Sequence, residues 1–236
     1  MKPIFVTGTD TGVGKTFAAC ALTAFCAMRK ALDVGVMKPL EAGLRLSGHD
    51  LLPSDAIMLK EASGSSDDLS LINPYLFESP LAPETASELE NVRVDLDLLD
   101  RAYERLKSSH EILFIEGAGG VLVPIVKNFF YVDLMKRWDV RALVVGRLGL
   151  GTINHTLLTC ACLAHAGVSV SGVILNDLEG KEDLAAKTNP EMLARYLDVP
   201  LLGVFPYMGN TPGNLPDRRV LADLVEKHIN TDPLFA

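Results

Sequence analysis

A lysine and a threonine, Lys15-Thr16, close a glycine-rich segment that begins at Gly8, directly after a short apolar run. In a P-loop, backbone N–H groups and the start of the next helix surround phosphates, the lysine reaches the terminal phosphate oxygens, and the hydroxyl binds Mg²⁺. Here the first glycine stands one residue early, and Thr9 occupies its usual place. A tight turn of small residues is the alternative, but the intact Gly14-Lys15-Thr16 ending favours nucleotide binding. The residues expected to contact the nucleotide in this loop are Thr9, Asp10, Gly12, Val13, Gly14, Lys15 and Thr16.

Polar residues also stand where three predicted strands end. Lys38, Glu116 and Asn176 each close a short apolar run, and ligands of open α/β sheets bind beyond the carboxyl ends of the strands. Lys38 would place a second cation beside a migrating phosphate, although a lysine at a strand end is often only solvated. Glu116 has the position of an acidic Mg²⁺ ligand, and the glycine-rich residues 117–120 would let a phosphate or substrate approach the backbone. Asn176 would either recognise adenine through its amide or simply end its strand.

Two predicted helix starts complete the candidate site. Asp55, next to Ser54, is either a metal ligand or a first-turn acid that complements the helix dipole. Residues 149–155 read Gly-Leu-Gly-Thr-Ile-Asn-His, and two glycines with a Thr152 cap would leave backbone N–H groups free to bind a carboxylate. His155 is either an acid–base group or a hydrogen-bonded structural residue, and the second role is the commoner one for a single histidine there.

The elements that must position these residues alternate between strand and helix. Near-continuous apolar runs predict buried parallel strands at 4–7, 34–38, 112–116, 142–146, 170–176 and 201–205. Helical patterns predict helices at 15–30, 54–62, 95–109, 152–166, 190–197 and 216–228. This alternation predicts an α/β fold, a doubly wound and mostly parallel sheet with helices on both faces, in one domain over residues 1–236. The long polar stretches 41–53 and 64–83 are expected to be functional loops.

Composition narrows the class of protein. The chain has 236 residues, 48% of them apolar, and a formal net charge of −8. Such a chain can bury a sizeable core but lacks the basic surface of a protein that binds nucleic acid or an anionic membrane. Its apolar runs are shorter than the roughly 18 residues of a membrane span, and the run 17–28 lacks the basic segment of a signal peptide. We therefore expect a cytoplasmic protein whose four cysteines, Cys20, Cys26, Cys160 and Cys162, stay reduced.

The whole set of motifs resembles the dethiobiotin synthetase family, and the resemblance extends over nearly all of the chain. It includes the loop 6–16 with its early glycine, Lys38-Pro39, Ser54-Asp55-Ala56, Asn73-Pro74-Tyr75, Glu116-Gly117-Ala118-Gly119-Gly120, Leu150-Gly151-Thr152-Ile153-Asn154-His155, Asn176-Asp177 and Pro200-Leu201-Leu202-Gly203. The family has a P-loop NTPase fold, so the resemblance implies the same architecture as the strand and helix pattern.

The resemblance also implies a reaction. ATP and Mg²⁺ would drive the carboxylation of 7,8-diaminononanoate by CO₂ (bicarbonate) and the closure of a cyclic urea, through a carbamate and its mixed anhydride with phosphate. The catalytic residues would be Lys38, Lys15 and Thr11, the metal ligands Thr16, Asp55 and Glu116, and the base-pocket residues Asn176 and Pro206. The substrate would contact Thr11, Lys38, Ala42, Gly119, Leu150, Gly151, Thr152 and Asn154. The family is a homodimer in which the partner's helix start binds the substrate carboxylate.

Three positions depart from the family pattern. Ala42 replaces a usual Ser or Thr, so a hydroxyl near the carbamate is missing or comes from elsewhere. Gly12 replaces a frequently acidic residue, and Glu84 stands where a histidine is frequent in the wall of the substrate pocket.

Three other functions compete with this one. An ATP switch of the partitioning or septum-positioning kind would carry a signature lysine at position 10, where this chain has Asp10, and often a basic membrane helix, which 216–228 is not. A cobyrinate-type amidotransferase would need a further glutaminase domain. An inactive relative that only binds ligands stays open because of Ala42.

Overall fold

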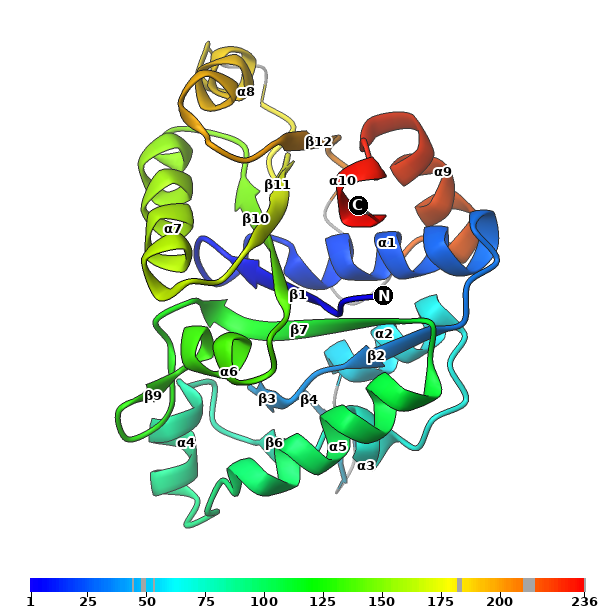
Figure 1. The fold of residues 1–236 in the computed structure, drawn as a ribbon, viewed down its shortest axis with the longest axis vertical. Helices are drawn as coiled ribbons and strands as arrows, with labels where there is room; N and C mark the ends of the chain where they lie inside the picture. Colours follow the sequence, from blue (N-terminus) through cyan, green and yellow to red (C-terminus); the bar gives the residue numbers. More distant parts are fainter. Residues whose placement is uncertain (44, 48–49, 53, 182–183, 210–214, 236) are drawn as a thin grey trace.

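A six-stranded parallel sheet forms the centre of the computed structural model, which describes residues 1–43, 45–47, 50–52, 54–181, 184–209 and 215–235. The strand order is β12-β11-β10-β1-β7-β2 (Figure 1). The bounds are β1 Ile4–Gly8, β2 Val34–Met37, β7 Ile112–Gly120, β10 Arg141–Arg147, β11 Val170–Asn176 and β12 Leu201–Phe205. All six predicted strands are present, and the largest difference is at β7, which continues beyond Glu116 to Gly120.

Helices cover both faces of this sheet (Figure 1). One face carries α1 (Lys15–Arg29), α2 (Ser54–Ser63), α9 (Arg218–His228) and α10 (Asp232–Phe235), whose buried residues form one core. The other carries α4 (Pro83–Leu89), α5 (Leu96–Ser109), α6 (Tyr131–Arg137), α7 (Thr152–Ala166) and α8 (Leu184–Tyr196), which share a second core. The short α3 (Leu69–Ile72) lies beside α2 and α5. The predicted doubly wound α/β class is therefore confirmed.

The two stretches predicted as long loops contain short regular elements. Between residues 40 and 77, β3 (Leu40–Ala42) pairs in parallel with β6 (Tyr75–Phe77), and β4 (Arg45–Ser47) pairs antiparallel with β5 (Asp50–Leu52). Another antiparallel pair, β8 (Pro124–Val126) and β9 (Phe129–Phe130), follows β7. Residues 44, 48, 49 and 53 of the predicted loop 41–53 lie outside the described residues. Strands of three residues are too short to give a periodic signal, so sequence patterns did not reveal them.

The prediction that a helix begins at Pro190 is wrong. Helix α8 begins at Leu184 and continues through Pro190, although proline favours the first turn of a helix. Tertiary contacts hold the residues on both sides of the proline, because Asn189 Nδ2 donates to the Gly149 carbonyl at 2.6 Å and Leu193 is fully buried. Helices α4 and α6 were not predicted, and α9 begins two residues after the predicted start, with Asp217 as its N-cap.

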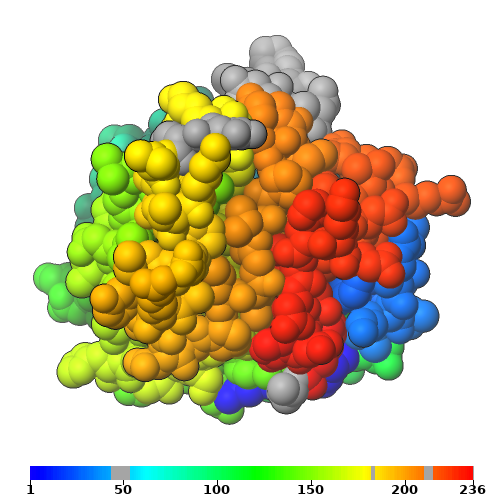
Figure 2. Space-filling model, turned by 90° about the horizontal axis from the view of Figure 1, so that it is seen from above, coloured from blue at the N-terminus to red at the C-terminus, as the bar shows by residue number. Residues whose placement is uncertain are grey.

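The β12 edge of the sheet is covered rather than open. Figure 2 looks onto this edge and shows α8 (yellow) and the C-terminal residues (red) on either side of the β12 segment (orange). Ile229 forms an antiparallel bridge to Gly203, and the Asn230 N–H donates to the Leu202 carbonyl at 2.7 Å. The C-terminal residues thus satisfy part of an edge that could otherwise pair with another chain. No helix in the described parts of the chain is long and apolar enough to cross a membrane.

Candidate nucleotide and substrate site

The phosphate loop connects the central strand β1 to α1, and close packing requires glycine at positions 8 and 14 of this loop. A Cβ at Gly8 would lie 2.6 Å from the Asp10 carbonyl oxygen and 2.9 Å from Lys15 Nζ, so only glycine fits at this early position. Gly14, the N-cap of α1, has a left-handed φ of 83°, which glycine adopts without strain. The Thr9 N–H donates to the Val145 carbonyl at 2.9 Å, which ties the loop to β10.

Lys15 lies buried at the mouth of this loop. Its Nζ donates to the Asp10 carbonyl at 3.0 Å. Burial, and then the nearby charge of Lys38, lower the pKa of Lys15 to about 8. A bound phosphate would favour the charged form of this lysine and raise its pKa again, because an anion stabilises an adjacent ammonium group.

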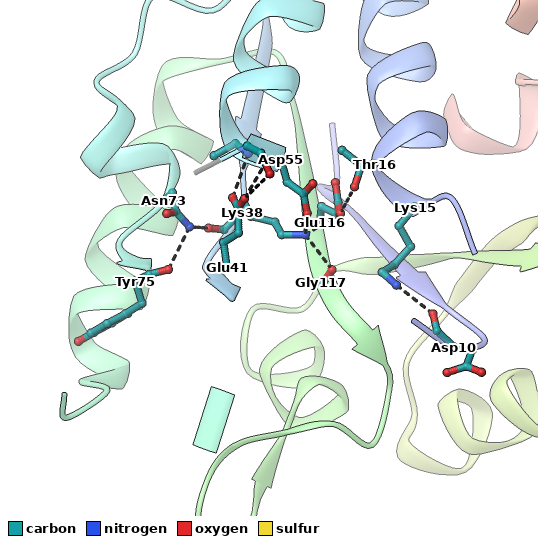
Figure 3. A network of polar contacts seen from close by, with 12 residues as sticks. Asp10, Lys15, Thr16, Lys38, Glu41, Asp55, Asn73, Tyr75, Glu116 and Gly117 are labelled. Atoms are coloured by element: carbon teal, nitrogen blue, oxygen red, sulfur yellow. Dashed lines mark hydrogen bonds and ion pairs between the residues drawn. The ribbon is translucent and has the colours of Figure 1, made fainter. Parts of the chain in front are cut away.

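Lys38 forms the centre of a buried ionic cluster directly after β2 and beside the middle of β7 (Figure 3). Its Nζ lies 2.7 Å from Asp55 Oδ2 and 2.6 Å from Glu116 Oε1, and it donates to the Gly117 carbonyl at 3.4 Å. Thr16 Oγ1 donates to Glu116 Oε1 at 2.9 Å. Four residues that are far apart in the sequence, from the first turns of α1 and α2, the residue after β2 and the middle of β7, therefore meet in one place. Lys38 and Glu116 are close together as expected, but Glu116 does not end its strand.

The charges in this cluster depend on one another. Burial alone would lower the pKa of Lys38, but Glu116 and Asp55 more than offset it, so that pKa lies above its ordinary value. Burial would raise the pKa of Asp55, yet Lys38 and a hydrogen bond from Thr16 hold it below its usual range. Burial raises the pKa of Glu116, with the Asp55 charge acting in the same direction. The two carboxylates thus favour the charged form of Lys38.

Two further side chains contact the segments that carry this cluster, and neither was assigned a role from the sequence, although Asn73 belongs to one of the motifs of the family resemblance. Asn73 Nδ2 donates to the Lys38 carbonyl at 2.6 Å and to the Tyr75 carbonyl at 3.1 Å. Glu41, on β3, accepts hydrogen bonds at the start of α2, where Asp55 stands. No local spacing links Glu41 to Asp55 or Asn73 to Lys38, because each pair is formed by tertiary packing.

A cavity of about 900 Å³ opens onto the loop and the cluster. Its lining includes the predicted residues Thr11, Gly12, Gly14, Lys15, Thr16, Lys38, Ala42, Asp55, Glu116 and Gly119. Residues 80–83 and Val123 form a largely apolar wall. Glu84 does not belong to this wall, because it lines a separate cavity between α4, the start of α5 and β8. Glu84, which departs from the family pattern, therefore lies next to the wall residue Pro83 but lines the neighbouring cavity.

A second, smaller cavity of about 330 Å³ lies on the other side of the P-loop and contains the residues predicted for the base. Gly12, Asn176 and Pro206 line it together with Phe17 and Tyr207. The buried Asn176 donates through Nδ2 to the Val13 carbonyl at 3.1 Å and to the Gly14 carbonyl at 3.0 Å. The donor of its amide is therefore used to hold the P-loop.

The glycine-rich start of α7 lies apart from the main cavity. Among the described residues that line that cavity, none comes from 147–154. The N-cap of α7 is Gly151, with φ 94°, so the prediction that Thr152 caps this helix is wrong. The Thr152 hydroxyl is buried within 3.4 Å of the Thr156 hydroxyl instead. His155 is solvent-exposed on the first turn, outside both cavities.

The oxygens of the cluster suit Mg²⁺. Glu116 Oε2 is buried and has no hydrogen-bond partner among the described residues, and Thr16 and Asp55 place further oxygens beside it. Mg²⁺ in phosphate-transfer sites is held by a few protein oxygens together with phosphates and water. Accordingly, no three His, Cys, Asp or Glu side chains within the described ranges are grouped so as to hold a metal by themselves.

Fold and loop together define a P-loop NTPase, and comparison with known proteins identifies the family. Residues 2–212 match a family described as an AAA domain. Solved structures with the same fold include the MinD cell division protein of Aquifex aeolicus, with a TM-score of 0.56, 15% identity and 96% of each chain covered. Another is a ParA family ATPase from Chlorobium tepidum, with a TM-score of 0.53, 14% identity, and 98% of this chain and 91% of that one covered.

The sequence relatives are more specific than the fold. The chain is 44% identical to the ATP-dependent dethiobiotin synthetase BioD of Thermodesulfovibrio yellowstonii over 213 residues, 86% of this chain and 88% of that protein. It is 36% identical to the protein of the same name from Bacillus subtilis over 235 residues, 100% of this chain and 98% of the other. The chain belongs to the family of ATP-dependent dethiobiotin synthetases.

Proposed function

We propose that the chain catalyses the ATP- and Mg²⁺-dependent conversion of 7,8-diaminononanoate and CO₂ to dethiobiotin. The observation that carries this proposal is the 900 Å³ cavity, which combines a phosphate loop, a second buried lysine and an apolar wall. The phosphate loop fits the nucleotide, Lys38 fits a reacting anion, and the wall fits an aliphatic chain. A nucleotide switch has no need for an apolar wall of this kind beside its phosphate loop.

The reaction assigns a task to each charged group. One substrate amine adds to CO₂ and loses a proton, giving a carbamate whose oxygen then attacks the γ-phosphorus and displaces ADP. The second amine attacks the resulting anhydride carbon, phosphate leaves, and the ring closes with loss of another proton. Lys15, Lys38 and Thr11 line the same cavity. Lys15 and Lys38 would stabilise the negative charge of the phosphate and the carbamate, and Thr11 would contact the substrate amines.

Thr16, Asp55 and Glu116 are the residues that would hold Mg²⁺. The metal would neutralise charge on the phosphate oxygens. The buried and unpartnered Glu116 Oε2 supports this assignment. Asn176 and Pro206 would hold the base, between Phe17 and Tyr207.

We further propose a homodimer in which the partner's Leu150, Gly151, Thr152 and Asn154 complete the substrate site. Helix α7 contains no Asp, Glu, Lys or Arg, which is unusual for a helix with a solvent-facing side. Leu158 on that side is 61% exposed, and Leu150 just before the helix is 83% exposed. Because this region does not line the cavity of its own chain, a second subunit would both cover it and use it.

The free cysteines support a location in a reducing compartment. All four cysteines are unpaired in the structure, and Cys20 and Cys26 are buried. Proteins of oxidising compartments more often bridge such residues, so we place the enzyme in the cytoplasm.

The decisive experiment measures ADP release by the purified chain with each substrate omitted in turn. We expect turnover only when diaminononanoate, bicarbonate, ATP and Mg²⁺ are all present, with dethiobiotin identified by mass. ATP hydrolysis that is the same with and without diaminononanoate and bicarbonate would contradict the proposal and favour a nucleotide switch.

Subunit mixing tests the shared site. In a Lys15→Met chain the phosphate loop is damaged, and in a Gly151→Glu chain a negative charge stands where the substrate carboxylate is expected. In a two-fold mixed dimer one site collects both lesions and the other none. Random exchange at equal amounts gives about half mixed dimers, and so about a quarter of wild-type activity. Activity that stays at the level of the parents after verified exchange would place the site within one chain.

A further inference from the structure

Glu41 is almost fully buried in the wall of the main cavity, and both of its carboxylate oxygens are occupied (Figure 3). Oε1 accepts hydrogen bonds from the Asp55 N–H at 2.8 Å and from Ser54 Oγ at 3.2 Å. Oε2 accepts one from the Ala56 N–H at 3.2 Å. Glu41 therefore binds the first turn of α2 through three donors.

This contact differs from an ordinary helix cap. A helix N-cap is the residue that directly precedes the helix, whereas Glu41 reaches α2 from the separate strand β3. Strand β3 begins two residues after Lys38, and α2 carries Asp55 in its first turn. Glu41 thus joins the two segments whose side chains meet in the 2.7 Å pair between Lys38 and Asp55.

The other end of α2 is held independently. Arg218 Nε donates to the Ala62 carbonyl at 2.8 Å, and its NH2 group donates to the Ser63 carbonyl at 2.9 Å. These bonds hold the C-terminal end of the helix. At the other end, from which Asp55 projects, Glu41 accepts the hydrogen bonds of the first turn, next to the packed side chain of Ala56.

The hydrogen bonds of Glu41 also argue against two simpler roles, that of a metal ligand and that of a base. A carboxylate whose two oxygens already accept three hydrogen bonds is poorly placed to bind a metal or to take a proton from a substrate amine. A third carboxylate beside Asp55 and Glu116 is also unfavourable electrostatically, because like charges repel strongly at low dielectric. Its contacts with the positive end of α2 compensate for this repulsion.

We infer that Glu41 is a positioning residue, which fixes the first turn of α2 so that the Asp55 carboxylate is held in place for the bound metal and for Lys38. The inference rests on the metal role proposed above for Asp55. Residues that orient metal ligands through hydrogen bonds typically change metal affinity by roughly 10- to 100-fold when they are removed.

The test uses the binding of a fluorescent ATP analogue to the full chain, titrated with Mg²⁺, which does not require diaminononanoate. Glu41→Ala should raise the Mg²⁺ concentration for half-maximal binding by roughly tenfold, the lower end of that range. Glu41→Gln, which keeps the length and one acceptor oxygen, should raise it less. Asp217→Ala is the matched control, because Asp217 accepts the Arg219 N–H at 2.8 Å at the start of α9, away from the cavity. Asp217→Ala should lower the melting temperature by an amount similar to that of Glu41→Ala and leave the Mg²⁺ response unchanged.

A double-mutant cycle shows whether Glu41 acts through Asp55. In an Asp55→Asn background, Glu41→Ala should change the Mg²⁺ response by less than about twofold, because coupled residues are not additive. Three results would each overturn the inference. The effects of the two substitutions on the Mg²⁺ concentration for half-maximal binding could be fully additive. Alternatively, Glu41→Ala (measured below its melting temperature) or Asp55→Asn could show the Mg²⁺ response of the wild type. The proposed reaction is judged separately, by whether the wild-type chain forms dethiobiotin.

Discussion

Replacing Lys38 by methionine keeps the length of the side chain but removes its charge from the buried cluster. Lys38 is 3% exposed and Glu116 is 1% exposed, so the substitution leaves a buried carboxylate without its cation. Removing one partner of a buried ion pair costs about 3–5 kcal/mol of unfolding free energy. Because the Asp55 side chain is 28% exposed and can be hydrated, we expect the lower end, about 3 kcal/mol.

This value predicts a measurable change in the melting temperature. For a chain of this size, each kcal/mol lowers Tm by about 2–4 °C, so Lys38→Met should melt about 6–12 °C below wild type. Calorimetry in Mg²⁺-free buffer measures the difference. Lys2→Met is the matched control, because Lys2 pairs with Asp139 at 2.8 Å on the surface, and such pairs contribute at most about 1 kcal/mol. If both variants melted within about 2 °C of each other, the cluster would not depend on Lys38 as argued.

Turnover of the same variant must be measured below its melting temperature. There, Lys38→Met should lower kcat far more than it weakens ATP binding, because its charge is expected to act on the transition state. A variant that lost ATP binding but kept its kcat would reverse this assignment.

Three further predictions address separate parts of the molecule. Ala42→Ser adds a hydroxyl in the main cavity and should raise kcat several-fold if it reaches the carbamate, about 1 kcal/mol for one hydrogen bond; an unchanged or lower kcat would show that another group already does this. Gly14→Ala should abolish tight nucleotide binding, because a Cβ there would overlap Asn176 Nδ2 and φ is 83°; tight binding by this variant would be inconsistent with the loop described. His110 lies 2.8 Å from both Asp33 and Asp67, and although burial opposes it, hydrogen bonds to these carboxylates raise its pKa. The stabilising effect of His110 is therefore complete below the unfolded-state pKa and is lost as pH rises through the folded-state pKa. In denaturant titrations, the difference in unfolding free energy between wild type and His110→Asn should shrink from pH 6 to pH 9. A constant or growing difference would contradict this.

The sequence predicted the central sheet and most of the main cavity because both have strong local signals. Buried parallel strands appear as continuous apolar runs, and the loop ending in Lys15-Thr16 has a fixed spacing. Lys38 and Glu116 could be placed together because parallel strands end at one edge of a sheet. These predictions needed only the element type and its direction.

The remaining features depend on contacts between distant segments, which no local pattern encodes. Glu41 was part of a presumed loop, and its function at the start of α2 appears only when β3 lies beside that helix. Pro190 was expected to begin a helix, but α8 continues on both sides of it, where the hydrogen bond from Asn189 to the Gly149 carbonyl holds the preceding turn in place. The effect of Glu84 on the pocket wall could not be derived from the sequence, because the orientation of α4 depends on tertiary packing.

The hydrogen bonds between Asn176 and the phosphate loop restrict how the proposed base cavity could be redesigned. A substitution of Asn176 that reshapes this cavity would also remove the two hydrogen bonds that Nδ2 donates to the loop carbonyls of Val13 and Gly14. Position 14 offers no compensating change, because its left-handed φ of 83° favours glycine whatever side chain stands at position 176. A successful redesign should therefore leave these two positions untouched and vary the opposite wall of the cavity, at Phe17 and Tyr207.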